Sequence, residues 1–197
     1  MNINANFDML HYLSHPRNKF PEQTLYEINT MLYLAELLSI YDGHHSQEWG
    51  YEFARNKYGA PVSKELIEET DFLYAKGYLN KDRMGYYSLS DTNSTRHLLS
   101  SMSNLKILGW KSKYIEAVFD SLLTKSFPKV VHAVHYEPGI SYLENINRTS
   151  TLLESSLENS LYEDFSVLHE MIGDPQIDLV VPASLWIDYL SSLEQQE

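Results

Sequence analysis

The chain of 197 residues is 43% apolar and 13% aromatic and carries a net charge of −12. Such a chain can form one domain or two small ones around a real core. It contains no cysteine, which excludes disulfides, thiolate zinc sites and a cysteine nucleophile and fits a reducing cytosol.

The first segments predict helices and a cytoplasmic protein. Apolar residues from Phe7 to His15 follow a helical spacing, and Pro16 is expected to end that helix. The first ten residues carry no basic group, unlike a signal peptide, and no apolar run reaches the ~18 residues of a membrane span. Pro21 suits the first turn of a helix that includes Leu25–Ile40. That stretch is apolar over so much of its circumference that we expect it at the centre of the fold.

A turn, a capped helix and a hairpin follow. Tyr58-Gly59-Ala60-Pro61 consists of turn-forming residues. Ser63 is a suitable N-cap for a helix that ends at Gly77. Two short β-prone runs, 78–80 and 86–89, flank a charged turn that contains a glycine. They predict a hairpin.

The rest of the chain is predicted to be mainly helical. Helices are expected over residues 95–102, 112–124, 141–172 and 182–193, with polar breaks between 145 and 151. The run Phe127–Tyr136 is open between a buried strand and a helix, and Pro138-Gly139 is expected to break it. Asp174-Pro175 predicts a turn.

Charge divides the chain into two regions. Residues 1–113 hold 12 basic and 13 acidic groups, whereas residues 114–197 hold 3 basic and 14 acidic groups. We therefore predict a mainly α (α+β) fold with two parts. Residues 1–110 would form a helical domain with a winged-helix-like hairpin, and residues 111–197 an acidic helical region packed on it.

One segment, residues 76–113, has the charge that nucleic acid requires. Its seven basic residues are the candidate nucleic-acid contacts: Lys76, Lys81, Arg83, Arg96, Lys106, Lys111 and Lys113. In a winged helix the helix before the hairpin enters the major groove and a basic hairpin touches phosphate. Here that helix carries four carboxylates, Glu65, Glu68, Glu69 and Asp71. A phosphate backbone would repel them, so we favour protein binding over DNA binding.

Two stretches carry a resemblance to a known family. They are Leu32-Tyr33-Leu34-Ala35-Glu36, followed by Gly43, and Phe53–Ser63, which contains Lys57-Tyr58-Gly59-Ala60-Pro61-Val62. They resemble the Panacea-type, SocA-like antitoxin domain, and are similar to the middle components of bacterial three-component defence systems that accompany an SMC-like ATPase. The chain departs from the pattern at Ala60, which stands between the glycine and the proline. The family's later aromatic–His–Pro segment survives only as His135-Tyr136-Glu137-Pro138.

The resemblance implies a non-enzymatic adaptor that holds a toxin, a protease adaptor or an ATPase. Gly59 tolerates unusual dihedral angles and Pro61 fixes one, so the turn can set the angle between two helices. Tyrosine suits interfaces because it joins an apolar ring to a hydroxyl group. The candidate partner contacts are the acidic half and Tyr33, Tyr58, Gly59, Pro61, Tyr74, Tyr78, Tyr86 and Tyr87.

Catalytic and metal-binding patterns are weak. The histidine pairs, with at most Asp8 or Glu137 as a third ligand, are His11 and His15, His44 and His45, and His132 and His135. His169-Glu170 begins like a zincin motif, but Gly173 stands where the second histidine is required. The sequence has no Gly-rich phosphate loop and no G-x-S-x-G elbow. We predict no catalytic residue, no metal ligand and no cofactor.

The sequence thus favours a non-catalytic protein-interaction subunit of a bacterial toxin–antitoxin or antiviral defence system that acts against phage or plasmids. An accessory subunit of an SMC-like ATPase complex is one form of this prediction. The partner would be a toxin or such an ATPase, with DNA contact through residues 76–113, no membrane contact, and self-association left open. A winged-helix DNA-binding transcriptional regulator is the alternative, and a metal-dependent enzyme is the third hypothesis.

Overall fold

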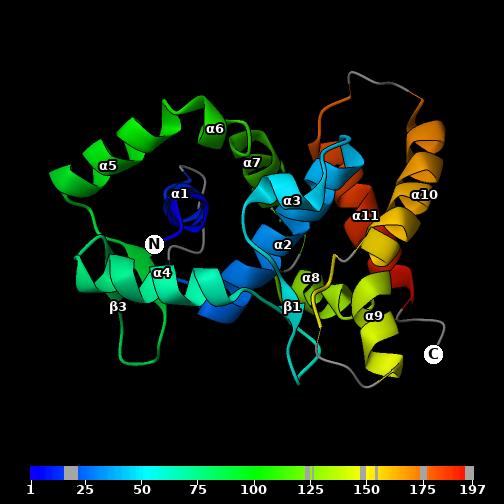
Figure 1. Cartoon of the computed structure of the whole chain (residues 1–197), viewed down its shortest axis with the longest axis horizontal. Coiled ribbons are helices and arrows are strands. Elements are labelled where there is room, and N and C mark those ends of the chain that lie inside the picture. The colour runs from blue at the N-terminus through cyan, green and yellow to red at the C-terminus, as the bar shows by residue number, and fades with distance from the viewer. Residues whose placement is uncertain are drawn as a thin grey trace.

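The computed structural model describes residues 1–15, 22–122, 125, 127–146, 150–153, 155–173 and 177–193. The predicted mainly α fold is confirmed (Figure 1). None of the described helices combines the length and the apolar character needed to cross a membrane. The predictions at Pro16, Pro21 and Asp174-Pro175 lie outside the described residues.

The elements, in chain order, are α1 (Ile3–Leu13), α2 (Leu25–Tyr41), α3 (Ser46–Trp49), β1 (Ala54–Arg55), β2 (Pro61–Val62), α4 (Lys64–Ala75), β3 (Leu79–Lys81), β4 (Tyr87–Leu89), α5 (Asn93–Ser103), α6 (Lys106–Gly109), α7 (Ser112–Ser121), α8 (Phe127–Val134), α9 (Pro138–Asn145), α10 (Ser155–Ile172) and α11 (Val180–Leu193).

The central helix is α2, as its apolar sequence predicts. Thr24 and Glu27 form a capping box at its N-terminus, in which each side chain bonds the other residue's backbone N–H. Every residue from Ile28 to Tyr41 is buried, so neighbours cover the helix on all sides. Such burial explains why no single apolar face stands out in its sequence.

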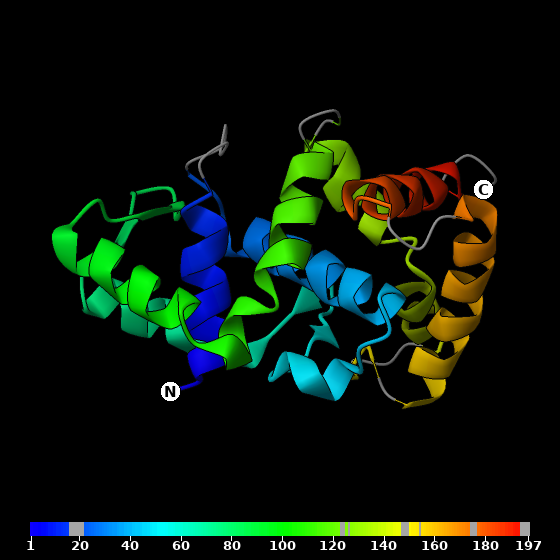
Figure 2. The ribbon, with the colours of Figure 1, turned by 90° about the horizontal axis from the view of Figure 1, so that it is seen from above.

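One continuous core joins the neutral and the acidic parts of the chain. It runs from Ala5 to Leu190 and includes side chains of α1, α2, α7, α8 and α11. Helix α7 packs on α1, α2 and α11, so the segment just after residue 110 lies in the middle of the fold. Figures 1 and 2 show α4 and α5 at one end of the molecule and α10 and α11 at the other.

The described residues also form two small β-hairpins. The predicted hairpin is present as β3 and β4, which pair antiparallel with Leu79 opposite Leu89. On the other side of β4, Gln23 and Tyr87 exchange two backbone hydrogen bonds of 3.0 and 2.7 Å. The second hairpin, β1 with β2, was not predicted, and the turn at Tyr58-Gly59-Ala60-Pro61 forms its tip.

The structure differs from, or completes, the sequence predictions at three other places. The ambiguous run from Phe127 is helix α8, because Phe127 and Val130 are buried while Lys129 and His132 are exposed, as helical spacing requires. The short helix α6 was missed. Helix α1 begins at Ile3, before the predicted start, since the side chain of Asn2 caps it by accepting from two backbone N–H groups.

Candidate functional site

Three segments that are distant in the sequence meet beside the β1–β2 hairpin. The hydroxyl of Tyr33 in α2 donates to Oε2 of Glu137 at 3.0 Å. The hydroxyl of Tyr26 lies 3.1 Å from Nε2 of His135. Gly59 faces the same histidine, because a Cβ built on it would lie 3.0 Å from His135 Nδ1. We call these five residues the signature site, since all of them except Tyr26 come from the stretches that carry the family resemblance.

Glu137 forms the buried floor of the signature site. Its side chain is fully buried, and Oε2 also accepts from the backbone N–H of Ile140 at 2.9 Å, which caps helix α9. Burial raises the pKa of Glu137, although the N–H groups of Ile140 and Gly139 and the Tyr33 hydroxyl oppose that shift. Burial and the carboxylate also raise the pKa of Tyr33 well above its ordinary value. These groups hold three segments together.

The rim of the signature site is exposed and aromatic. Tyr58 is 74% exposed at the tip of the hairpin, and Nζ of Lys57 lies 4.8 Å from its ring centre. Asn56 stabilises the turn, because its Oδ1 accepts from the backbone N–H groups of Tyr58 and Ala60, at 2.8 and 3.0 Å. A large aromatic side chain on a rigid turn is suited to contact with another molecule.

An ion pair joins the hairpin to α9 beside the same site. Nη2 of Arg55 lies 3.4 Å from Oε1 of Glu144, and the arginine is nearly buried while the glutamate is exposed. The pKa of His135 is lowered, mainly by burial and also by the neighbouring His132. Arg55 also lowers the pKa of His135, and Glu144 opposes the shift.

Replacing Gly59 with alanine is expected to destabilise the protein more than the same change at Gly85. Both glycines have positive φ angles, +80° and +90°, where an L residue costs about 1–2 kcal/mol. A Cβ at Gly59 also meets His135 at 3.0 Å, whereas one at Gly85 has no atom within 4 Å. Urea unfolding of both variants measures the difference. Equal losses would contradict the close approach of the hairpin to His135.

The other predicted partner contacts differ in their exposure to solvent. Tyr74 is 48% exposed on α4, and Tyr78 and Tyr86 are half-buried. Tyr33, Pro61 and Tyr87 are buried, so they cannot contact a partner directly in this conformation. The tyrosines were predicted as contacts from residue type and Pro61 from the signature turn, and their burial shows that all three pack inside the fold instead.

The predicted nucleic-acid contacts do not form one patch of free cations. Lys76, Lys81, Arg83 and Lys106 are exposed. Arg96 and Lys113 are exposed but paired with Asp91 and Asp42, at 2.6 Å each. Lys111 is completely buried against Asp8, so its prediction as a phosphate contact is wrong for this fold.

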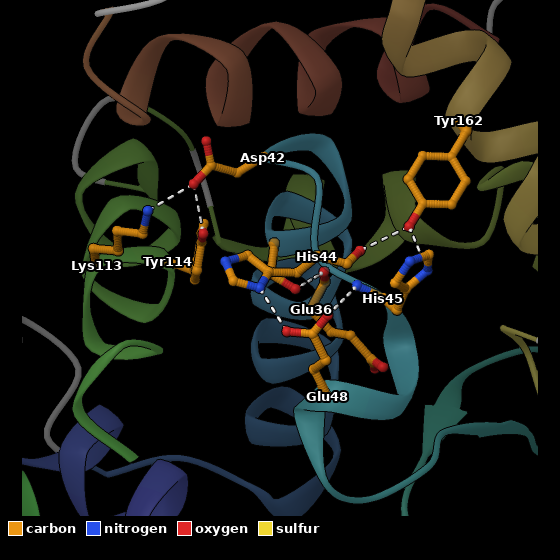
Figure 3. Close-up of polar contacts among 9 residues, drawn as sticks. Glu36, Asp42, His44, His45, Glu48, Lys113, Tyr114 and Tyr162 are labelled. Atoms are coloured by element: carbon orange, nitrogen blue, oxygen red, sulfur yellow. Dashed lines mark hydrogen bonds and ion pairs between the residues drawn. The ribbon is translucent and has the colours of Figure 1, made fainter. Parts of the chain in front are cut away.

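A second polar cluster lies at the end of α2 (Figure 3). Nδ1 of His44 lies 2.9 Å from Oε2 of Glu48, and its ring stacks on Trp110 with centroids 4.4 Å apart. His45 lies on the other side, where the hydroxyl of Tyr162 is 3.1 Å from its Nδ1 and donates to the His44 carbonyl at 2.8 Å. Tyr162 belongs to α10, so the cluster ties the acidic region to the loop after α2.

Asp42 completes this cluster from the α7 side. Its Oδ2 accepts from Nζ of Lys113 and from the hydroxyl of Tyr114, at 2.6 Å each (Figure 3). Burial alone would raise the pKa of Asp42, but these hydrogen bonds outweigh it and lower the pKa. His44, His45 and Asp42 thus each face a different partner. The arrangement joins α2, α7 and α10 and does not aim several polar groups at one reacting atom.

The predicted histidine pairs also have separate structural partners. Nε2 of His11 lies 3.2 Å from Glu116, and the ring of His15 stacks on Phe119 at 4.3 Å. The rings of His132 and His135 are 6.2 Å apart. Within the described ranges, no group of three or more His, Asp or Glu side chains is placed to hold a metal ion.

Comparison of the chain with family models, with curated proteins and with solved structures gave no match. The family resemblance therefore stays a prediction.

Proposed function

We propose that the chain is a non-catalytic protein-interaction subunit of a bacterial toxin–antitoxin or antiviral defence system. The observation that carries the proposal is Tyr58, which is 74% exposed on a turn fixed by Asn56. Tyrosine is enriched among the residues that dominate interface energies. Because the turn is already ordered, a partner gains the contact at a small entropic cost.

The family resemblance supports the choice of system. The signature stretches at Leu32–Glu36 and Phe53–Ser63 meet residues 135–137 in one site, where Tyr33 bonds Glu137 and Gly59 approaches His135. A toxin or an SMC-like ATPase encoded beside this gene is the expected partner. Tyr74 on α4 is a second predicted partner contact that is exposed.

Co-expression of the tagged chain with its neighbouring genes is expected to recover a partner at fixed stoichiometry. The variant Tyr58→Ala should bind that partner at least about tenfold more weakly, as for an interface hot spot. The matched control is Ile107→Ala, because Ile107 on α6 is 73% exposed. Surface plasmon resonance measures both Kd values. Recovery of the chain alone contradicts the function, and an unchanged Kd for Tyr58→Ala contradicts the surface.

The alternative, a winged-helix DNA-binding regulator, has one specific observation in its favour. The β3–β4 hairpin, with Gln23 paired to the outer side of β4, follows a helix and carries exposed Lys81 and Arg83. Against it, α4 exposes Glu68 and Asp71 on the face that would meet phosphate. A mobility-shift titration from low to high salt separates the two functions, because phosphate contacts are strongest at low salt.

A further inference from the structure

An open apolar groove lies between α10 and α11. These two helices are at the end of the molecule opposite α4 and α5 (Figures 1 and 2). Its volume is about 520 Å³. The exposed apolar side chains on its walls are Val167 and Met171 from α10 and Val181, Leu185 and Tyr189 from α11. Met171 is 79% exposed and Val167 is 58% exposed. A contiguous exposed apolar surface of this kind marks an interaction site.

The walls of the groove follow helical spacing. Val181, Leu185 and Tyr189 recur every four residues along α11, and Val167 and Met171 do so along α10. The eight helical steps from Val181 to Tyr189 span about 12 Å, which is roughly two helical turns. A groove of this length and lining accepts the apolar stripe of one amphipathic helix, with anchors at i, i+4 and i+7.

Side chains of α10 and α11 meet at the floor of the groove. Trp186 is only 7% exposed, and its ring packs against Phe165 with centroids 4.8 Å apart. Both residues belong to the continuous core. The floor of the groove is therefore part of the packed core.

The groove lies in a strongly acidic part of the sequence. Residues 149–197 include ten Asp and Glu and neither Lys nor Arg. Asp164 lines the groove, and Glu163, Glu170 and Asp178 are exposed on the same helix pair and the segment between them. The pKa of Asp164 is raised by burial and by Glu163, so a cation placed there would relieve an unfavourable charge. Lys125 pairs with Asp188 of α11.

We propose that this groove binds an amphipathic helix of a partner protein whose apolar stripe is flanked by lysine or arginine. Apolar burial supplies the affinity, and the acidic surroundings select a basic helix. A second copy of this acidic region or an anionic membrane surface would be repelled. The groove does not include Tyr58, so helix binding there is independent of the toxin–antitoxin or defence assignment.

The test uses the full chain and three synthetic peptides of about 18 residues, a length at which an isolated helix can form. The first carries leucines at helical spacing and lysines elsewhere, the second replaces lysine with glutamate, and the third scrambles the first. Fluorescence anisotropy measures each Kd. We expect the basic amphipathic peptide to bind at least about tenfold more tightly than the other two. Equal binding by the scrambled peptide, or no binding by any, overturns the proposal.

Variants locate the binding. Met171→Lys is expected to weaken the basic peptide at least about tenfold, because it adds a like charge inside the groove. Met84→Lys is the matched control, since Met84 in the β3–β4 turn is also 79% exposed. Val167→Lys serves as a second groove variant, and thermal unfolding checks that each variant is folded. Equal Kd values for the groove variants and the control overturn the proposal.

Peptide binding and partner recovery are separate outcomes, so the groove and the proposed function can fail independently. A chain that binds the basic peptide through the groove but is recovered without any neighbour-encoded partner contradicts only the proposed function. A chain that recovers its partner but shows no preference for the basic peptide contradicts only the groove.

Discussion

Replacing Lys111 with methionine is expected to lower the free energy of unfolding by about 3–5 kcal/mol, the usual loss when one partner of a buried ion pair is removed. Nζ of Lys111 lies 3.0 Å from Oδ2 of Asp8, and both side chains are completely buried. Methionine fills a similar volume but leaves the Asp8 carboxylate without a counter-charge. Chemical unfolding at neutral pH measures the loss.

The surroundings of the pair explain why it is sensitive. The hydroxyl of Tyr51 donates to the same Oδ2 of Asp8 at 2.9 Å, and Nζ of Lys111 lies 4.7 Å from the Trp49 ring centre. Burial raises the pKa of Asp8 and lowers that of Lys111, while the attraction within the pair opposes both shifts. Without Lys111 the pKa of Asp8 rises further. A raised folded-state pKa favours the protonated acid, so the deficit of the variant should shrink as the pH falls.

Two variants control this prediction. Lys113→Met removes a lysine two residues away that is half exposed and paired with Asp42, and it should cost no more than about 1 kcal/mol. The double variant Asp8→Asn with Lys111→Met should recover much of the loss, because asparagine is neutral and still accepts from Tyr51. A Lys111→Met variant as stable as Lys113→Met would contradict the buried pair.

Lys111 also shows where sequence reasoning failed. It lies in a basic segment, and charge alone placed it among the phosphate contacts together with Lys106 and Lys113. Its partner Asp8 is 103 residues away in the sequence. Only the packing of α7 on α1 brings the two together. Local charge predicts the sign of a region, but it does not predict which member of a basic run is buried.

Elements with strong local signals were predictable. Leu25–Ile40 carries an apolar pattern and a capping box, and Ser63 caps α4 as expected. The hairpin at 79–89 follows from two β-prone runs around a glycine turn. The β1–β2 hairpin was missed because each strand has two residues, too few for an alternating pattern.

The sequence predicted the segments of the signature site but not the contacts between them. The stretches at Leu32–Glu36 and around Gly59 stood out by their resemblance, and residues 135–138 were noted as a weak remnant. The hydrogen bond between Tyr33 and Glu137 forms because α2 lies near α9, and residue spacing in the sequence could not predict it. The groove was missed because the apolar residues of α10 and α11 resemble core positions. Their exposure appears only when the two helices are placed together.

Replacing Glu137 with alanine is expected to cost about 2–4 kcal/mol. The change leaves the buried hydroxyl of Tyr33 without its acceptor and removes the cap on the backbone N–H of Ile140. Tyr33→Phe is the matched comparison, because it removes the same hydroxyl while the cap on α9 stays. It should therefore cost less than Glu137→Ala. Equal losses from the two changes would show that the cap contributes nothing.

The isosteric change Glu137→Gln tests the charge itself. Because burial raises the folded-state pKa of Glu137, its ionisation costs stability as the pH rises from the ordinary pKa of a glutamate through the raised value. Glutamine does not titrate. The stability of Glu137→Gln relative to the wild type should therefore rise over that pH range, and the difference should stay constant at higher pH. Unfolding free energies of both proteins across acidic and neutral pH give the comparison. Parallel curves would mean that Glu137 titrates as it does in the unfolded chain, and the floor of the signature site would then be open to water.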